Sequence, residues 1–326
     1  MAKQILGLDI GGTKCAVIIG SLEADGTIQL LRKSSFPTET AKGFDDTLGR
    51  IFSFTDELLE KCGLSADSLS AIGISCGGPL DSKLGIVMSP PNLPGWDYIP
   101  IVELFEKRYG VRVALQNDAN ACALAEWKYG AGRGYDNVIF LTFGTGMGSG
   151  LILNGQLYAG TNDMAGEVGH IRLERFGPVG YGKAGSFEGF CSGSGITQLA
   201  QTKALEKLQM GEKVSFCTCF EQLNNITAKS VAEAALAGDP LALEVYRICG
   251  SYLGSALSVL IDILNPEVIV LGSIYGRAQA LLEPEMRKVI QQECVSHAQR
   301  VCRIVPAGLE ENIGDYAALS VATNIL

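Results

Sequence analysis

The sequence predicts an α/β protein of two domains. Its 326 residues allow a large buried core and exceed the usual length of a single domain. Glycine is abundant, with 40 residues, while charged residues make up a moderate 19%, which is typical of a compact α/β chain. Two segments, 5–20 and 138–155, each combine two apolar runs with a glycine turn, and each therefore predicts a hairpin of two strands.

Apolar runs and turn residues predict the remaining elements in chain order. Short apolar runs between turn residues predict strands at 27–37, 70–75, 111–115, 267–271 and 301–305. Apolar spacing of helical period predicts helices at 43–62, 101–109 and 121–130, and a mostly helical stretch from 196 to 264. Two segments rich in glycine, proline or polar residues predict loops, at 89–100 and 159–195.

The composition excludes several classes of function. The net charge of -9 argues against a nucleic-acid partner, because phosphate backbones require basic surfaces. The ten cysteines are scattered without a CxxC spacing, as free thiols in a reducing cytoplasm usually are, and only two histidines could join a zinc site. No basic leader precedes the first strand. The most apolar helix, near 252–264, is interrupted by Gly254 and Asp262 and is too short to span a bilayer, so we expect a cytoplasmic protein without a membrane partner.

The hairpin at 138–155 has the composition of a phosphate-binding loop. Its first strand runs into four alternating glycines, Gly144, Gly146, Gly148 and Gly150. Glycine permits positive φ and leaves room for a ligand close to the backbone. Three residues add hydroxyl groups, namely Thr142, Thr145 and Ser149. A concave set of N–H and O–H donors suits a phosphate, although a glycine hairpin is also compatible with a simple tight turn.

The hairpin at 5–20 repeats this pattern and adds a carboxylate. Gly11 and Gly12 form its turn, and Asp9 lies just before them. A carboxylate beside a phosphate loop is repelled unless a divalent cation lies between them, and Mg²⁺ binds one or two carboxylates together with phosphate oxygens. The alternative is an aspartate that braces the turn through the backbone. Two such hairpins indicate a duplicated half-structure that binds one nucleotide.

Two polar groups of residues could carry chemistry. Asn117 and Asp118 lie where a strand ends and a helix begins, so they either cap the helix or, as amide and base, bind a substrate hydroxyl. Glu167 and His170 lie three residues apart in a glycine-containing loop, without the HExxH spacing of a metal site. A single histidine is commonly structural, but with Glu167 and Glu188 it offers donors and acceptors suited to sugar hydroxyls.

Six motifs are distributed along nearly the whole chain: LGLDIGGTK (6–14), GGP (77–79), NLPGW (92–96), QNDANA (116–121), FGTGMGSGLILNG (143–155) and AGEVGH (165–170). With these motifs the chain resembles the ROK family of glucokinase-like sugar kinases and sugar-responsive repressors, within the actin-like ATPase superfamily. The resemblance implies a two-domain actin-like (ribonuclease H-like) α/β fold with ATP and sugar in an interdomain cleft. It places 1–117 and about 314–326 in a small domain and 118–313 in a large one.

The resemblance also implies the roles of individual residues. Asp118 would be the catalytic base and would contact the sugar together with Gly78, Asn92, Asn117, Glu167, His170 and Glu188. The two hairpins would bind the phosphates of ATP through Gly11, Gly12, Thr13, Lys14, Thr142, Gly144, Thr145 and Gly146. Mg²⁺ would lie near Asp9, held through water, and Gly272 would face the adenosine. Members of the family often form homodimers.

The chain departs from the family pattern at two places. The family commonly carries a CxCGxxGCxE zinc motif, with the histidine of EVGH as the fourth ligand. Here Val179, Tyr181 and Ser186 stand at the three cysteine positions, so we expect no structural zinc and a His170 oriented by hydrogen bonds or packing. At 272–276 a GSIYG sequence replaces a glycine run and changes the expected adenine contacts.

These observations predict an ATP- and Mg²⁺-dependent hexose kinase that phosphorylates the C6 hydroxyl of glucose. The polar set is equally compatible with N-acetylglucosamine, N-acetylmannosamine, fructose or allose. A non-catalytic sugar-sensing protein is the alternative of another class. Repressors of the family carry a helix-turn-helix extension before the first hairpin, whereas this chain reaches its hairpin by residue 5, so no DNA-binding module is visible.

Overall fold

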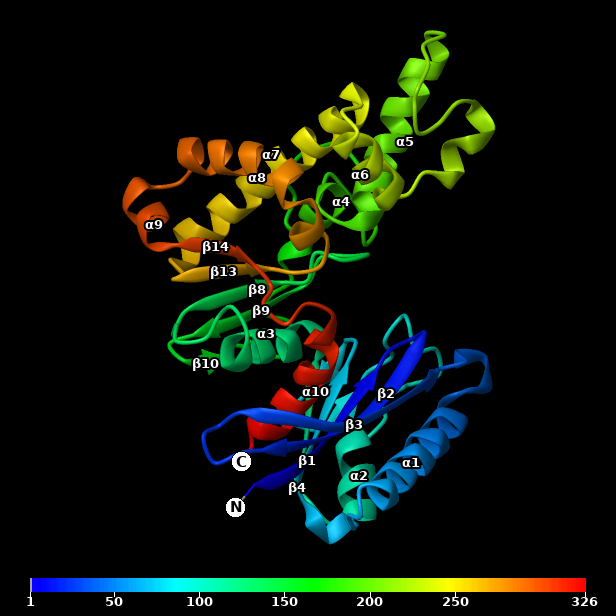
Figure 1. Cartoon of the computed structure of the whole chain (residues 1–326), viewed down its shortest axis with the longest axis vertical. Helices are drawn as coiled ribbons and strands as arrows, with labels where there is room; N and C mark the ends of the chain where they lie inside the picture. Colours follow the sequence, from blue (N-terminus) through cyan, green and yellow to red (C-terminus); the bar gives the residue numbers. More distant parts are fainter. Residues whose placement is uncertain (1) are drawn as a thin grey trace. The chain divides into compact units, whose positions relative to one another are not determined.

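The computed structural model describes residues 2–326 and divides into two compact units (Figure 1). The first unit consists of the residues up to Gly134 together with Gly150–Ala165 and Gly308–Leu326. The second unit consists of Tyr135–Ser149 and Gly166–Ala307. Each unit contains strands and helices, which confirms the predicted α/β class.

The sheet of the first unit has five strands in the order β3-β2-β1-β4-β7. The predicted hairpin is formed by β1 (Lys3–Ile10) and β2 (Lys14–Leu22), and β3 (Ile28–Pro37) extends it, all antiparallel. On the other side, β4 (Leu69–Cys76) and β7 (Val113–Asn117) run parallel to β1. The carboxyl ends of β1, β4 and β7 therefore meet at one edge, where open α/β sheets bind ligands.

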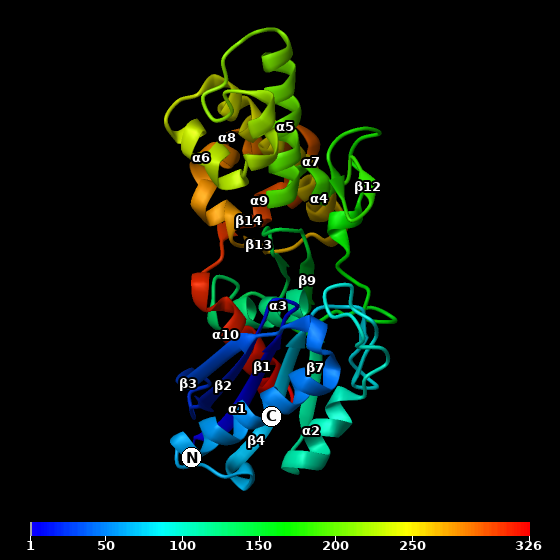
Figure 2. The same ribbon diagram turned by 90° about the vertical axis from the view of Figure 1, so that its right-hand side faces the viewer.

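Helices cover both faces of this sheet because its buried strands are apolar on both sides. The helices α1 (Phe44–Lys61) and α2 (Ile101–Tyr109) pack on one face with the alternating residues Leu6 and Leu8 (Figures 1 and 2). The helix α10 (Ile313–Thr323) packs on the other face and contacts α3 (Asp118–Tyr129). At Gly73 a Cβ atom would lie 2.3 Å from the Ala318 carbonyl oxygen, so α10 approaches β4 closely.

The second sheet has the order β10-β9-β8-β13-β14. The second predicted hairpin is formed by β8 (Val138–Leu141) and β9 (Ser149–Leu153), and β10 (Gln156–Leu157) follows β9. The strands β13 (Val268–Leu271) and β14 (Arg303–Pro306) run parallel to β8. Both β8 and β13 are buried along their whole length, which explains their continuous apolar sequences.

Helices make up most of the second unit. They are α4 (Phe187–Phe190), α5 (Gly193–Gln209), α6 (Ala228–Leu236), α7 (Pro240–Leu264), α8 (Ile274–Glu293) and α9 (Ser296–Val301). Two short hairpins were not predicted, β5–β6 (Leu80–Asp81 and Ile86–Val87) and β11–β12 (Val179–Gly180 and Lys183–Ala184). Two-residue strands carry too little periodicity to be detected in a sequence.

The length expected for the most apolar helix was wrong. Instead of beginning near residue 252, α7 begins at Pro240 with Asp239 as its cap and spans 25 residues. By length and composition it could cross a membrane, but core helices pass the same test, and half of its apolar window is buried. Gly250 and Gly254 face α8, where a Cβ atom would lie 2.7 Å from carbonyl oxygens of that helix.

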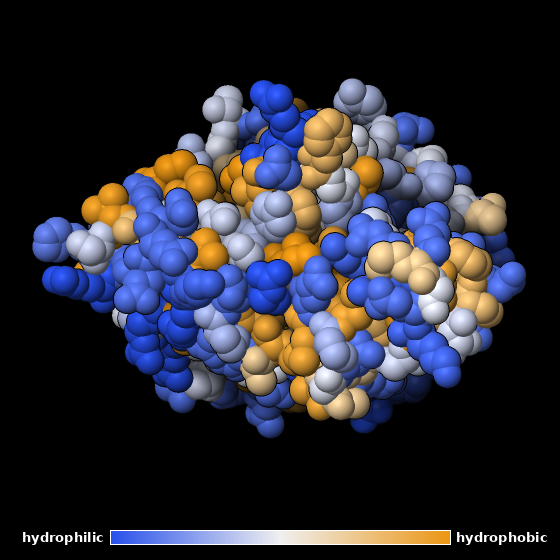
Figure 3. All heavy atoms as spheres, turned by 90° about the horizontal axis from the view of Figure 1, so that it is seen from above, coloured by the Kyte–Doolittle hydropathy of each residue, from blue (hydrophilic) through white to orange (hydrophobic). Residues whose placement is uncertain are grey.

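From above the view of Figure 1, hydrophobic side chains are interspersed with hydrophilic ones (Figure 3).

Candidate active site

The structure brings the predicted site residues together in two groups, one within each unit. The first unit holds Asp9, Gly11, Gly12, Thr13, Lys14, Gly78, Asn92, Asn117 and Asp118. The second unit holds Thr142, Gly144, Thr145, Gly146, Glu167, His170, Glu188 and Gly272. Each group is built around one glycine hairpin.

The tip of the first hairpin exposes backbone donors. It closes with a 3.1 Å hydrogen bond from the Gly11 N–H to the Lys14 carbonyl oxygen. Within residues 2–326, the N–H groups of Gly12 and Thr13 donate to no protein acceptor. Gly12 cannot carry a side chain, because a Cβ atom would lie 2.3 Å from the Asn92 carbonyl oxygen. Neighbouring N–H groups without partners, at a tip with no bulky side chain, suit an anionic ligand.

Asp9 precedes this tip and is half-buried. Burial raises its pKa to about 6, repulsion from Asp118 adds to the rise, and the positive charge of Lys14 opposes it. No described residue donates a hydrogen bond to its carboxylate, so the alternative of an aspartate that braces the turn receives no support. Residues 2–326 contain no cluster of three or more metal-ligating side chains. A cation here would need water and phosphate oxygens as further ligands, which fits Mg²⁺.

The register of the parallel strands places Asn117 and Asp118 at the same edge. Asp9 pairs with Ser75 on β4, and Ser75 pairs with Gln116 on β7, one residue before Asn117. A Cβ atom on Gly78 would lie 3.1 Å from Asn117 Nδ2. The glycines of the turn after β4 therefore allow the amide of Asn117 to lie against the backbone.

Asn117 caps the helix, as the structural alternative predicted. The Ala119 N–H donates to Asn117 Oδ1 at 2.9 Å and to Asp118 Oδ1 at 2.8 Å. Asp118 as a residue is exposed to solvent, but protein atoms around its carboxyl group desolvate it and raise its pKa. The hydrogen bond from the Ala119 N–H opposes this rise of the pKa. A less hydrated carboxylate with a raised pKa is a stronger base than a free aspartate.

Asn92 lies beside both glycine turns of the first unit. Its Nδ2 atom would lie 3.1 Å from a Cβ atom on Gly77, and its carbonyl oxygen faces Gly12. The proline- and glycine-rich loop at 89–100 therefore contacts the hairpin tip and the turn after β4. The sequence predicted this loop but not its contact with the hairpin.

In the second hairpin, carbonyl oxygens of the loop accept hydrogen bonds from residues outside the hairpin. The Gly193 N–H donates to the Gly144 carbonyl oxygen at 2.8 Å, and the Ile274 N–H donates to the Phe143 carbonyl oxygen at 3.0 Å. Ser194 Oγ donates to the Thr145 carbonyl oxygen at 3.0 Å. These bonds connect the loop to the first turns of α5 and α8.

Thr142 and Gly272 complete the base of this loop. Thr142 Oγ1 accepts a 2.9 Å hydrogen bond from the Gly148 N–H, which closes the hairpin from within. A Cβ atom on Gly272 would lie 3.1 Å from the Thr142 carbonyl oxygen, so the end of β13 lies against the end of β8. The predicted phosphate and adenosine residues of the second unit are therefore neighbours.

Glu188 is tied to the second hairpin. Its Oε2 atom accepts a 2.9 Å hydrogen bond from the Met147 N–H, and a Cβ atom on Gly146 would lie 2.9 Å from the same oxygen. Glu167 and His170 are both exposed at the ends of the short helical turn η3 (Val168–His170). One carboxylate of the predicted sugar set thus also positions the loop predicted to bind phosphate.

His170 and the zinc-motif positions are organised by contacts that need no metal. The rings of His170 and Tyr181 pack edge-on, with their centroids 6.2 Å apart. Lys183 Nζ donates to the His170 carbonyl oxygen at 2.7 Å. Ser186 is fully buried and accepts a 3.1 Å hydrogen bond from the Gly189 N–H. Valine, tyrosine and a buried hydroxyl are not zinc ligands, so this donor set does not fit zinc.

Thr38 contacts the first hairpin and Arg50 contacts Thr38; both residues were missed in the sequence. Thr38 is fully buried and donates through Oγ1 to the Gly11 carbonyl oxygen at 2.5 Å. Arg50 Nη2 donates to the Thr38 carbonyl oxygen at 2.5 Å. Neither residue belongs to a motif; only the pairing of β2 with β3, which ends opposite Lys14 at Pro37, could have located Thr38 at the tip.

Comparison with known proteins agrees with this architecture. A model of the ROK family matches residues 5–324. A glucokinase of Thermotoga maritima is 31% identical over 98% of this chain and 96% of its own length. The DNA-binding transcriptional repressor Mlc of Escherichia coli is 30% identical over 76% of this chain and 59% of its own length. A ROK family glucokinase from Streptomyces griseus, solved with glucose and AMPPNP, superposes with a TM-score of 0.74 at 28% identity, covering 98% of this chain and 99% of that structure.

Proposed function

The chain belongs to the ROK family and has its two-domain actin-like ATPase fold, and from this premise we propose that it is an ATP-dependent hexose kinase. The chain is related to sugar kinases, because it is 31% identical to a glucokinase. The finer proposal is transfer of the γ-phosphoryl group of ATP to the C6 hydroxyl of glucose. A cytoplasmic homodimer is the form we expect for this enzyme.

The observation that carries the proposal is the position of Asp118. It lies at the carboxyl end of a parallel strand, close enough to Asp9 for their charges to repel, in the same unit as a hairpin tip with unpartnered N–H groups. Phosphoryl transfer requires mainly a base, a metal ion and aligned phosphates. The first unit offers residues suited to each of these three roles.

In the proposed reaction, Asp118 accepts the proton of the sugar hydroxyl as the new P–O bond forms. Its Oδ1 atom is held by the Ala119 N–H, so Oδ2 is the atom we assign to the substrate. The N–H groups of Gly12 and Thr13 would bind phosphate oxygens, and those of the 144–146 loop would do the same. Bound Mg²⁺ would neutralise charge on the β and γ oxygens, with Asp9 holding it through water.

The sugar-binding residues are proposed from both units. Asn117, Asn92 and Gly78 lie around the strand end that carries Asp118. Glu167, His170 and Glu188 lie around the second hairpin. Glucose is the proposed substrate because glucokinases are among the relatives, and N-acetylmannosamine or N-acetylglucosamine is the alternative within the same activity.

A non-catalytic sugar sensor is the second candidate, because the repressor Mlc is also a relative. A coupled assay of ADP release with glucose, fructose, allose, N-acetylglucosamine and N-acetylmannosamine separates the two candidates. A kinase turns over at least one of these sugars, whereas a sensor binds a sugar and turns over none.

The variant Asp118→Asn tests the assigned base. We expect kcat to fall by at least about 10²-fold, the usual range for loss of a general base, with sugar binding and the melting temperature close to those of the wild type. Asp67→Asn is the matched control, because Asp67 is an exposed aspartate of the same unit outside the site. Wild-type turnover by Asp118→Asn would contradict the assignment.

A further inference from the structure

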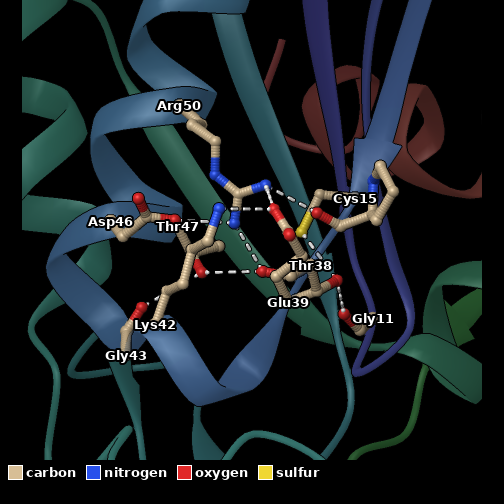
Figure 4. Close-up of polar contacts among 10 residues, drawn as sticks. Gly11, Cys15, Thr38, Glu39, Lys42, Gly43, Asp46, Thr47 and Arg50 are labelled. Atoms are coloured by element: carbon tan, nitrogen blue, oxygen red, sulfur yellow. Dashed lines mark hydrogen bonds and ion pairs between the residues drawn. The ribbon is translucent and has the colours of Figure 1, made fainter.

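Thr38 is the first residue after β3. Its side chain bonds the tip of the first hairpin (Figure 4), and its backbone N–H bonds the same tip. Thr38 Oγ1 donates to the Gly11 carbonyl oxygen at 2.5 Å, and the Thr38 N–H donates to the Thr13 carbonyl oxygen at 2.9 Å. The side chain is fully buried, so water does not compete for these bonds.

The bond to Gly11 also determines where the Gly12 N–H points. The Gly11 carbonyl and the Gly12 N–H belong to one planar trans peptide, in which they point in opposite directions. A carbonyl held toward Thr38 therefore directs the Gly12 N–H away from Thr38, and within residues 2–326 this N–H meets no protein acceptor. Two consecutive glycines otherwise allow this peptide to rotate more freely than any other sequence would.

Thr38 is itself held in place from α1. Arg50 Nη1 donates to the Pro37 carbonyl oxygen at 2.7 Å, and Nη2 donates to that of Thr38 at 2.5 Å. The guanidinium group lies over the Phe36 ring at 4.9 Å, and Thr47 Oγ1 lies 3.2 Å from the Gly43 carbonyl oxygen and 3.4 Å from that of Thr38. Two side chains of α1, those of Arg50 and Thr47, thus contact the backbone of the residue that holds the tip.

Arg50 is also oriented by acidic neighbours. Its Nη1 atom lies 3.1 Å from Glu39 Oε2, and its Nη2 atom lies 2.8 Å from Asp46 Oδ2 (Figure 4). The guanidinium group is therefore neutralised by carboxylates and points its donors at backbone carbonyls. Because it bonds Thr38 and not the hairpin tip, its proposed action on a ligand is indirect, through Thr38 and Gly11.

We propose that Thr38, supported by Arg50, is a positioning residue that holds the Gly12 N–H in the direction needed to bind a phosphate of ATP. This inference rests on the proposed ATP-dependent function, and it adds a group that no motif of the chain contains. It assigns Thr38 to the nucleotide and not to the sugar. A purely structural Thr38 would change stability and leave nucleotide affinity unchanged.

The test compares Thr38→Val, which removes the donor at similar shape, with Thr38→Ser, which retains it. The Kd for Mg²⁺·ATP is measured by calorimetry in the absence of sugar, and the KM values for ATP and glucose are measured in the ADP-release assay. We expect Thr38→Val to weaken ATP binding by about tenfold, the scale of one lost buried hydrogen bond, while the KM for glucose changes less than about twofold. Thr38→Ser restores ATP affinity to near the wild-type value.

Arg50→Gln is expected to weaken ATP binding by about threefold, because Thr38 keeps its own bonds to Gly11 and Thr13. Arg108→Gln is the matched control: Arg108 also stacks on an aromatic ring, at 4.6 Å from Phe52, and pairs with an aspartate, but it does not contact Thr38. Its ATP affinity should equal that of the wild type.

Unchanged ATP affinity in Thr38→Val overturns the inference, as does an equal loss in Thr38→Ser. A lower melting temperature without a change in ATP affinity overturns it in favour of a structural role. If the wild type binds ATP but turns over no sugar, the proposed function fails while the Kd comparison still decides the role of Thr38. A wild type that binds no ATP contradicts both proposals.

Discussion

The two glycine hairpins share a sequence pattern but are held by different donors. In the first hairpin, the Gly11 carbonyl accepts a hydrogen bond from a side chain, that of Thr38. In the second, the Gly144 and Phe143 carbonyls accept bonds from backbone N–H groups of Gly193 and Ile274. A backbone donor survives every substitution except proline, whereas a side-chain donor is lost in one substitution. The bond to the Gly11 carbonyl should therefore be lost more easily by substitution than the bond to the Gly144 carbonyl, although each hairpin also has one bond of the other kind, from the Thr38 N–H and from Ser194 Oγ.

The glycines of the two hairpins also differ in what surrounds them. Around Gly12 a Cβ atom would meet backbone, the Asn92 carbonyl oxygen at 2.3 Å. Around Gly146 it would meet the end of a side chain, Glu188 Oε2 at 2.9 Å, and around Gly144 nothing closer than 3.7 Å. The three positions therefore favour glycine for different reasons. At Gly12 the neighbouring backbone is close, at Gly146 the end of a mobile side chain is close, and at Gly144 a glycine leaves the surface bare.

The largest expected effect comes from Gly12→Ala compared with Gly144→Ala. We expect Gly12→Ala to reduce kcat/KM for ATP by more than about 10²-fold and to lower the free energy of unfolding by roughly 1–3 kcal/mol, because the Asn92 backbone must move. Gly144→Ala should change the free energy of unfolding by less than about 1 kcal/mol. Enzyme assays and urea unfolding measure both variants, and equal effects would show that the contrast between the hairpins is incorrect.

The second prediction concerns the charge of Asp9, since only the first hairpin has a carboxylate just before its glycine turn. The pKa of Asp9 is raised from 3.8 to about 6, so its ionised form destabilises the folded protein above pH 6. This penalty disappears as the pH falls through 6 toward 3.8. In the absence of ligands, Asp9→Asn should therefore be more stable than the wild type at pH 7.5, by on the order of 1–3 kcal/mol, with little difference at pH 4.

Urea unfolding at the two pH values measures this difference. Added Mg²⁺·ATP should stabilise the wild type more than Asp9→Asn, because the proposed cation site needs the carboxylate. A stability difference that does not depend on pH would contradict the raised pKa. Equal stabilisation of both proteins by Mg²⁺·ATP would contradict the proposed role of Asp9 near the cation.

The smallest expected effect is that of Ser194→Ala in the second hairpin. The variant removes the Oγ bond to the Thr145 carbonyl oxygen, but the Ser194 N–H still lies 3.4 Å from the same oxygen. We expect the Kd for ATP to rise less than about threefold, compared with about tenfold for Thr38→Val. Calorimetric titration with Mg²⁺·ATP measures both, and a larger effect in Ser194→Ala would reverse the comparison.

Local patterns in the sequence predicted the parts of the molecule that local residues determine. Apolar runs ending in glycine located both hairpins, and the dipeptide at 117–118 was placed where a strand meets a helix. The same pattern predicted a cap, and Asn117 is one. The strands at 70–75 and 267–271 were also found, because continuous apolar runs are typical of buried parallel strands.

Contacts between distant residues could not be predicted in this way. Thr38 and Gly11 are brought together by strand pairing, and no periodicity encodes which donor will meet a carbonyl. The full length of α7 was missed because Gly250 and Gly254 lower helix propensity, while their packing against α8 compensates. The assignments of ligands to residues, and the domain boundary at residue 117, remain predictions.

The cap at the start of α3 restricts what Asn117 can recognise. Its amide oxygen accepts the Ala119 N–H with one of its two lone pairs, which fixes the orientation of the amide and leaves both hydrogens on Nδ2 as donors. An atom that approaches there must bring a lone pair. A sugar oxygen satisfies that requirement at Nδ2 and an ammonium group does not, so the helix cap determines which part of a ligand can contact the Nδ2 side of Asn117.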